Sequence, residues 1–238
     1  MRVLLWSVAA LTLASAPGCG GSSDAPAAAA SARPAPAPAD PAPAAAPVRT
    51  GRPRIVFLGD SLTAGLGLPP EESYPSLIQA RLDKAGQAFE VVNAGVSGDT
   101  SAGGLRRLEW SLEGDVAVLV VALGGNDALR GLPPAELKRN LAAIIEGAKP
   151  HTQAIVLVGM EAPPNNGPEY TAAFRQVYQD LAREYDVRLV PFLLDKVGGV
   201  VSLNQADGIH PNTQGAQIVA DTVWSALTPL LTPVPPTK

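Results

Sequence analysis

The feature that most constrains the fold is a set of five short apolar runs that recur along the chain after residue 50. The runs occupy residues 54–58, 89–93, 116–122, 154–159 and 188–191. The third, VAVLVVA, is apolar throughout, which is typical of a central strand covered on both faces. Helical patterns separate the runs, most clearly at 133–148, 169–185 and about 212–230. This alternation predicts an α/β protein in which helices cover both faces of a parallel sheet.

The first 50 residues differ in composition and are expected to lie outside this domain. Residues 1–18 combine an early arginine, a short apolar stretch and small residues, as in a secretory signal peptide. The apolar stretch is too short to span a membrane. Residues 19–50 are almost entirely Ala, Pro, Ser, Gly and Asp, which predicts a disordered tether. Residues 51–238 are then expected to form one domain with a sizeable core.

Cys19 is the single cysteine, so the chain cannot form an intramolecular disulfide. Its place just after the apolar stretch makes it a candidate for the lipid-modified cysteine of a bacterial lipoprotein, which would attach the protein to a membrane. The alternative is a soluble secreted protein with a free thiol. Both readings predict export, to the bacterial periplasm.

The first apolar run ends in a turn whose role is ambiguous. In FLGDSLTAG, Ser61 directly follows the run, at the edge of a parallel sheet where reactive groups are often placed. The stretch lacks the second glycine of the G-x-S-x-G nucleophile elbow. From this segment alone, Ser61 is either a nucleophile or a residue that caps the following helix.

A serine nucleophile needs a base and a carboxylate that orients the base. Of the two histidines, His151 is predicted at the amino end of the fourth strand, away from the site edge, and is expected to be a surface residue. His210 is predicted at the site edge, three residues after Asp207, where the carboxylate can hold Nδ1 and leave Nε2 for the serine. The alternative is that Asp207 only caps a turn. Asn212 is expected to cap the last helix.

Acyl transfer also needs hydrogen-bond donors for the oxyanion that develops on the substrate. The backbone N–H groups of Ser61 and Gly98 and the side-chain amide of Asn126 are candidates, because each follows a predicted strand. Each signal is weak by itself, since SGDT can be a turn with a helix cap and GGND can be a loop. Together they form a constellation at one edge of the sheet.

Four blocks of the sequence, FLGDSLTAG, NAGVSGDTS, LGGNDALRG and DGIHPN, together resemble those of the SGNH (GDSL) hydrolases over residues 54–230. The subgroup to which the chain is most similar contains bacterial periplasmic arylesterases, thioesterases I and lysophospholipases, as in GVSGDTSAGGLRRL and GMEAPPNNGPEY. The resemblance implies a three-layer α/β/α sandwich with a five-stranded parallel sheet, the flavodoxin-like SGNH hydrolase fold.

The same resemblance implies roles for individual residues. Ser61 would be the nucleophile, His210 the base and Asp207 the acid that orients it. Ser61, Gly98 and Asn126 would form the oxyanion hole. Asp60, the acid of the first block, is then expected to hold the nucleophile turn together.

The resemblance further implies hydrolysis of short-to-medium acyl or aryl esters or thioesters through an acyl-serine, with activity declining at acid pH, where histidine is protonated. Candidate pocket residues, which could instead only brace loops, are Leu129, Leu132, Met160, Pro163 and Pro164. No cofactor or metal is expected, and a net charge of −4 argues against a nucleic-acid partner. The protein is expected to be a monomer. Two alternatives remain: a carbohydrate O-acetyl esterase, and a non-catalytic surface lipoprotein that binds lipid or glycan.

Overall fold

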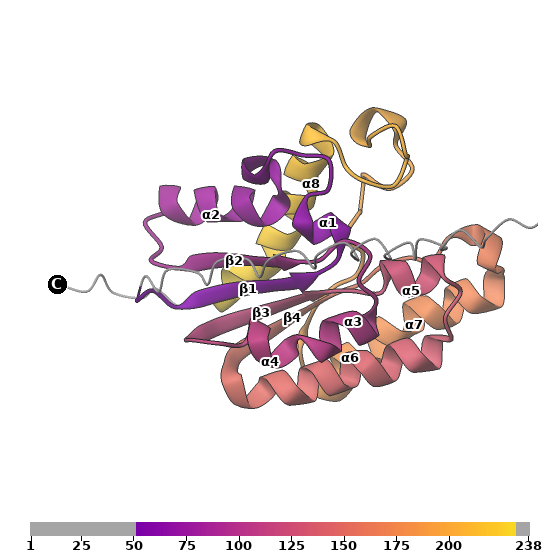
Figure 1. Ribbon diagram of the computed structural model, residues 1–238, viewed down its shortest axis with the longest axis horizontal. Helices are drawn as coiled ribbons and strands as arrows, with labels where there is room; N and C mark the ends of the chain where they lie inside the picture. The colour runs from indigo at the N-terminus through magenta and orange to yellow at the C-terminus, as the bar shows by residue number, and fades with distance from the viewer. Residues whose placement is uncertain (1–50, 232–238) are drawn as a thin grey trace, which may run out of the picture. The chain divides into compact units, whose positions relative to one another are not determined.

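A five-stranded sheet forms the centre of the computed structural model, which describes residues 51–231 (Figure 1). The strands are β1 Arg54–Gly59, β2 Glu90–Gly95, β3 Val116–Ala122, β4 Thr152–Val158 and β5 Arg188–Val190. Their order is β2-β1-β3-β4-β5, and each neighbouring pair is parallel. The predicted five-stranded parallel sheet is therefore confirmed.

Helices cover both faces of the sheet and complete three layers (Figure 1). One face carries α2 Tyr74–Lys84 and α8 Thr213–Leu227, which contact each other. The opposite face carries α3 Ser101–Arg106, α4 Leu108–Ser111, α6 Pro134–Ala148 and α7 Pro168–Tyr185. Two short helices, α1 Ser61–Ala64 and α5 Gly125–Leu129, follow β1 and β3. Single 3-10 turns occur at Pro70–Glu72, Lys149–His151, Pro164–Asn166, Val201–Leu203 and Thr228–Leu230.

The central strand β3 is buried along its whole length, as its continuous apolar sequence predicts. Aromatic side chains join the layers around it. Phe57 of β1 meets Tyr74 of α2 edge to face, with ring centroids 5.6 Å apart. On the other face, Phe174 and Tyr178 of α7 form a similar pair at 5.7 Å. The sheet is thus covered by packed side chains on both faces and gives a rigid support for the loops at its edges.

The observed element bounds differ from the expected ones mainly at the ends. Strand β2 extends to Gly95, because its backbone continues to pair with β1 through Gly59. The last helix ends at Leu227 rather than near residue 230, and a 3-10 turn follows. Pro229 is consistent with this end, since proline has no N–H to continue the helical hydrogen bonding.

The strand order places a switch point at the carboxyl ends of β1 and β3. The chain moves from β1 to β2 at one edge and then crosses back to β3 on the other side of β1. The connections that follow β1 and β3 therefore leave the sheet toward opposite faces, and a crevice opens between them. Ser61 and Asn126 lie in these two connections.

The predicted signal peptide (1–18), the lipidation candidate Cys19 and the tether (19–50) lie outside the described residues. Within residues 51–231, no helix is both long and apolar enough to cross a membrane.

Candidate active site

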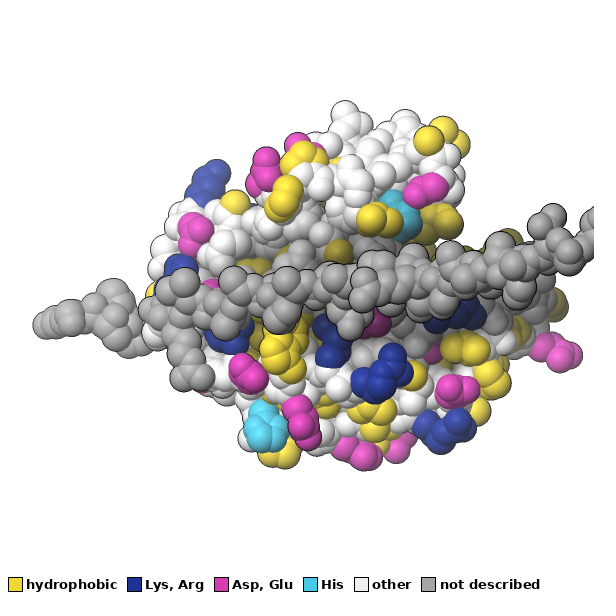
Figure 2. Space-filling view, in the orientation of Figure 1, with side chains coloured by type: hydrophobic (Ala, Val, Ile, Leu, Met, Phe, Trp, Pro, Cys, Tyr) yellow, Lys and Arg dark blue, Asp and Glu magenta, His cyan; other side chains and the backbone are white. Residues whose placement is uncertain are grey.

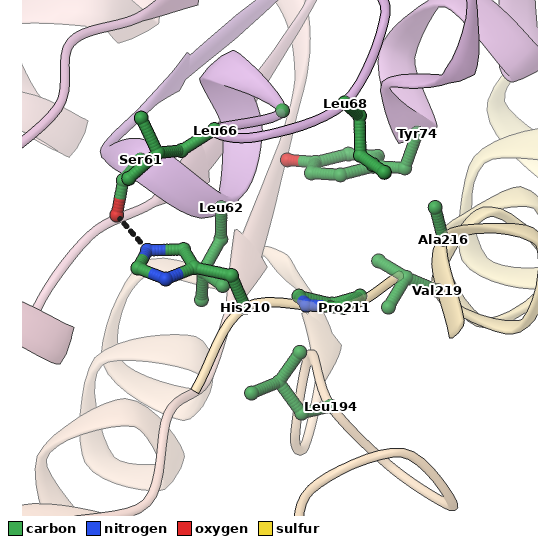
Figure 3. Close-up of a pocket in the computed structure, with 11 residues that line it drawn as sticks. Ser61, Leu62, Leu66, Leu68, Tyr74, Leu194, His210, Pro211, Ala216 and Val219 are labelled. Atoms are coloured by element: carbon green, nitrogen blue, oxygen red, sulfur yellow. Dashed lines mark hydrogen bonds between the residues drawn. The ribbon is translucent and has the colours of Figure 1, made fainter. Parts of the chain in front are cut away.

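The nucleophile turn begins where β1 ends. Asp60 is the N-cap of α1, and its Oδ1 accepts a hydrogen bond from the Leu62 N–H at 3.0 Å. Ser61 is therefore the first residue of the helix and not its cap. Its hydroxyl instead lies 2.8 Å from Nε2 of His210 (Figure 3). This arrangement decides between the two readings of the serine that the sequence left open.

The turn from Asp207 to His210 is organised by its own hydrogen bonds. Oδ1 of Asp207 accepts from the N–H groups of Ile209 at 2.9 Å and His210 at 3.0 Å. Oδ2 lies 2.6 Å from Nδ1 of His210. The backbone N–H of His210, then that of Ile209, and then the imidazole lower the pKa of Asp207 to about 2. The carboxylate is thus ionised at neutral pH and holds Nδ1–H, which leaves Nε2 as the acceptor for the serine hydroxyl.

Three candidate oxyanion donors lie in connected loops. Gly98 has φ +84°, a conformation that glycine adopts easily, and within residues 51–231 no acceptor is hydrogen-bonded to its N–H. Nδ2 of Asn126 donates to the carbonyl of Asp99, the next residue, at 2.9 Å. The same nitrogen lies 3.5 Å from Oδ2 of Asp60, the residue before Ser61. Asn126 thereby links the loop of Gly98 to the nucleophile turn.

Asp60 occupies an unusual electrostatic position. Its side chain is almost fully buried, and this burial raises its pKa from 3.8 to about 6. The hydrogen bond from Leu62 and the charge of His210 oppose the rise. Asp60 caps α1 and contacts Asn126, in agreement with the expected role in holding the turn.

A second buried acid, Asp127, was not singled out from the sequence. Its carboxylate accepts hydrogen bonds from the backbone N–H of Ser101 at 2.8 Å and from the Ser101 hydroxyl at 2.5 Å. Asn140 of α6 donates to the same hydroxyl at 2.9 Å. Asp127 thus fastens the start of α3 to α5, directly beside Asn126. The available signal was an acid directly after Asn126, at the carboxyl end of a buried strand.

Ser61, Asn126 and His210 open into one cleft of about 470 Å³. Gly98 is not part of its lining. Its walls are mostly apolar and include four of the five predicted pocket residues, Leu129, Met160, Pro163 and Pro164. The fifth, Leu132, does not line the cleft, and this expectation is corrected. The backbone of Leu132 donates to the Asp127 carbonyl at 2.9 Å and accepts from the Tyr170 hydroxyl at 2.7 Å, so Leu132 braces its loop.

Another wall of the cleft comes from residues that sequence reasoning missed, Phe192, Leu194, Gly198, Gly199 and Ile209. They belong to the long loop between β5 and α8. The rule that sites lie beyond the carboxyl ends of parallel strands points to this loop as well. Next to the Ser61–His210 pair, the apolar side chains of Leu62, Leu66 and Val219 line a second, much smaller hollow (Figure 3).

The other histidine, His151, lies just before β4, at the opposite end of the sheet strands, and is exposed. Figure 2 shows the histidine side chains at two well-separated places on the surface. Among residues 51–231 no group of three or more His, Cys, Asp or Glu side chains is placed to hold a metal ion.

A serine, a histidine and an aspartate hydrogen-bonded in series, beside donors for an oxyanion, are the arrangement of the serine hydrolases. Comparison with known proteins identifies the family. Residues 57–218 match the model of the GDSL-like lipase/acylhydrolase family. Since this match covers more than half of the chain, the protein belongs to that family.

One similar protein is esterase TesA of Pseudomonas aeruginosa, which is 46% identical to this chain over 178 residues. The match covers 74% of this chain and 89% of TesA. Thioesterase 1/protease 1/lysophospholipase L1 of Escherichia coli K12 is 38% identical over 74% of this chain and 84% of its own length. Among solved structures, esterase EstA from Pseudoalteromonas sp., inhibited by monoethylphosphonate, superposes with a TM-score of 0.71 at 31% identity. That match covers 75% of this chain and 98% of EstA.

Proposed function

We propose that this protein is a serine esterase that hydrolyses carboxylic esters or thioesters of short-to-medium acyl or aryl substrates. The observation that carries the proposal is the unbroken hydrogen-bond series from Asp207 through His210 to Ser61, which opens into an apolar cleft. The names of the relatives, an esterase and a thioesterase that is also a lysophospholipase, support the same reaction class.

In the proposed reaction, Ser61 Oγ attacks the carbonyl carbon of the substrate while Nε2 of His210 takes the hydroxyl proton. Asp207, ionised in this turn, stabilises the imidazolium. The N–H groups of Ser61 and Gly98 and the amide of Asn126 receive the oxyanion. The carbon–oxygen or carbon–sulfur bond then breaks, and the leaving alcohol or thiol takes the proton from Nε2. Water repeats the sequence on the acyl-serine, releases the carboxylic acid and restores Ser61.

The walls of the cleft favour an acyl chain over an acetylated sugar as the group bound next to Ser61. Leu129, Met160, Phe192 and Ile209 present carbon surface, which suits an acyl chain and offers no hydrogen-bond partner to a sugar hydroxyl placed against it. A carbohydrate O-acetyl esterase is therefore the weaker alternative.

Covalent labelling by an alkyl phosphonate, the inhibitor class named for EstA, combined with turnover of aryl, acyl-thioester and acetylated-sugar substrates, tests the proposal. We expect the wild-type protein to be labelled once, at Ser61, and to prefer the acyl substrates. Ser61→Ala should lose labelling and about 10⁴-fold or more of kcat. Ser202→Ala, a change at an exposed serine, is the control. Ester cleavage by a clean Ser61→Ala preparation would refute the assignment, and a preference for acetylated sugars would refute the substrate class.

We also propose that the protein is exported and attached to a membrane through a lipid on Cys19, as the composition of residues 1–50 predicts. Expression of the full chain in a bacterium, followed by fractionation and mass spectrometry of the mature N-terminus, tests this. A lipid-modified Cys19 as the first residue is the expected result, and Cys19→Ser should move the protein out of the membrane fraction. An unmodified N-terminus at another residue would contradict lipidation.

A further inference from the structure

Arg107 occupies a conspicuous position for a charged residue. It follows the last residue of α3 and lies between α3 and α4, and its side chain is 16% exposed. A buried guanidinium is unfavourable unless its donors find acceptors. Its hydrogen bonds therefore indicate what it holds.

The guanidinium joins three segments that are far apart in the sequence. Nη2 donates to the carbonyl of Gly59 at 2.8 Å, at the end of β1. Nη1 donates to the carbonyl of Ala94 at 2.7 Å, near the end of β2. Nε donates to Oδ2 of Asp99 at 2.7 Å, and this carboxylate is 18% exposed. One planar side chain thus binds two strand ends and the loop between β2 and α3.

Each of these contacts is close to a proposed catalytic group. Gly59 lies two residues before Ser61, and its carbonyl also accepts the N–H of Val96 at 3.0 Å. Asp99 directly follows Gly98, the candidate donor in an exposed turn. The carbonyl of Asp99 accepts the Asn126 amide at 2.9 Å. Arg107 therefore lies between the nucleophile turn and the loop that carries Gly98 and accepts the Asn126 amide.

The surroundings of Asp99 are shaped for this contact. A Cβ on Gly103 would lie 2.4 Å from Oδ1 of Asp99, so only glycine there leaves room for the carboxylate. A guanidinium offers donors in a fixed plane, which a lysine ammonium cannot reproduce. Arg107 itself is not among the residues that line the cleft.

We propose that Arg107 is a positioning residue that fixes the oxyanion donors Gly98 and Asn126 relative to the nucleophile Ser61. The inference rests on the proposed function, since it concerns the same site. It makes a specific kinetic prediction. Because Arg107 does not contact the cleft, its loss should leave substrate binding nearly unchanged and lower the rate of acyl transfer, as expected for an oxyanion hole that is misplaced by a fraction of an ångström.

The decisive experiment compares Arg107→Lys and Asp99→Asn with the neighbouring control Arg106→Lys, whose parent side chain is exposed. For each folded variant, kcat, KM and the rate of phosphonate labelling are measured across pH. We expect Arg107→Lys to lower kcat and the labelling rate by about 10- to 100-fold, with KM changed less than about threefold. Asp99→Asn should act in the same direction, and the double variant should be no worse than about the stronger single change, because both break one link.

The shape of the pH profile separates positioning from other roles. Arg107 makes no contact with the Asp207–His210 pair, so the acid limb of the profile should stay in place in Arg107→Lys. Wild-type kcat in Arg107→Lys, a change confined to KM, or a loss matched by Arg106→Lys would overturn the inference. If Arg107→Lys does not fold, Asp99→Asn decides alone. Absence of labelling or turnover in the wild type would instead refute the proposed function, so the two failures are distinguishable.

Discussion

The loop that carries Asp207 and His210 and the turns that carry Ser61, Gly98 and Asn126 are anchored in opposite ways. In the first, Asp207 hydrogen-bonds Ile209 and His210 within one short turn, and the Asp207 side chain is 44% exposed. In the second, buried or half-buried charged groups hold segments together across the sequence: Arg107 binds Gly59, Ala94 and Asp99, and Asp127 binds Ser101.

The difference follows from what each part of the site has to do. We call the Asp207–His210 turn the base part, and the turns that carry Ser61, Gly98 and Asn126 the oxyanion part. A base must reach one hydroxyl and be held by one carboxylate, and a short turn provides this. An oxyanion hole requires donors from several strand ends in one fixed arrangement, and only cross-links between those strand ends can fix it. We therefore expect the base part to depend on a few chemical groups, and the oxyanion part to depend on a network of cross-links between strand ends.

The largest expected effect is on the base part. His210→Ala should lower kcat/KM for an aryl ester by about 10⁴-fold or more, because Ser61 loses the acceptor of its proton. The matched control is His151→Ala, a change at the other, exposed histidine. Steady-state kinetics measure both. Comparable losses in the two variants would mean that the Asp207–His210 turn has no special role.

Asn126→Ala tests the oxyanion part. Removal of one oxyanion donor should lower kcat by about 10²- to 10³-fold with little change in KM. Asn165→Ala, at an exposed position of the turn Pro164–Asn166, is the control. Steady-state kinetics over a range of substrate concentrations separate kcat from KM. A change in kcat smaller than about tenfold would indicate that Gly98 and Ser61 supply the donors without Asn126. It would also contradict the expectation that the oxyanion part depends on a network.

Asp60→Asn measures how the buried carboxyl group of Asp60, next to Ser61, affects the free energy of unfolding. Folded Asp60 keeps its proton up to about pH 6, whereas the unfolded residue loses it near 3.8. Between these values the unfolded state binds fewer protons, so the free energy of unfolding falls as the pH rises through this window. Asparagine keeps an acceptor for Leu62 and carries no charge.

Asp60→Asn should therefore be more stable than the wild type above pH 6, by up to about 3 kcal/mol, and show no advantage below pH 4. Urea unfolding at pH 4 and pH 7.5 measures this difference. The exposed Asp195→Asn is the control and should show no such pH dependence. Equal stability of Asp60→Asn and wild type at pH 7.5 would contradict the raised pKa.

The smallest effect is expected at Gln205, whose Nε2 ties the His210 loop to the carbonyl of Leu66 at 2.7 Å and to that of Pro211 at 3.0 Å. Gln205→Ala should cost about 1 kcal/mol of stability and at most a few-fold in kcat, because Asp207 and His210 keep their own bonds. Thermal unfolding and kinetics beside Gln217→Ala, on the exposed side of α8, measure this. A loss in kcat as large as that of Asn126→Ala would show that this loop, too, depends on a network.

Much of the architecture could be predicted because it depends on local patterns. The continuous apolar sequence of β3 and the 3/4 spacing in α6 and α7 indicated a buried strand and two amphipathic helices. Helix α2 was expected only in general, as a helical pattern between two apolar runs, and received no bounds, although its signals are present: the N-cap Ser73, a proline in the first turn and buried residues at helical spacing.

In the active site, too, the features that depend on local sequence could be predicted, and those that depend on tertiary contacts could not. The sequence by itself determined the Asp207–His210 turn, since its partners are three residues apart and one turn of backbone brings them together. It also determined which strand ends carry polar groups. Only the tertiary structure decided that Ser61 faces His210 rather than capping α1, that Leu132 is not part of the cleft lining, and that Arg107 joins β1, β2 and Asp99. These contacts join residues up to 149 positions apart, and strand order and packing, not local spacing, bring such residues together.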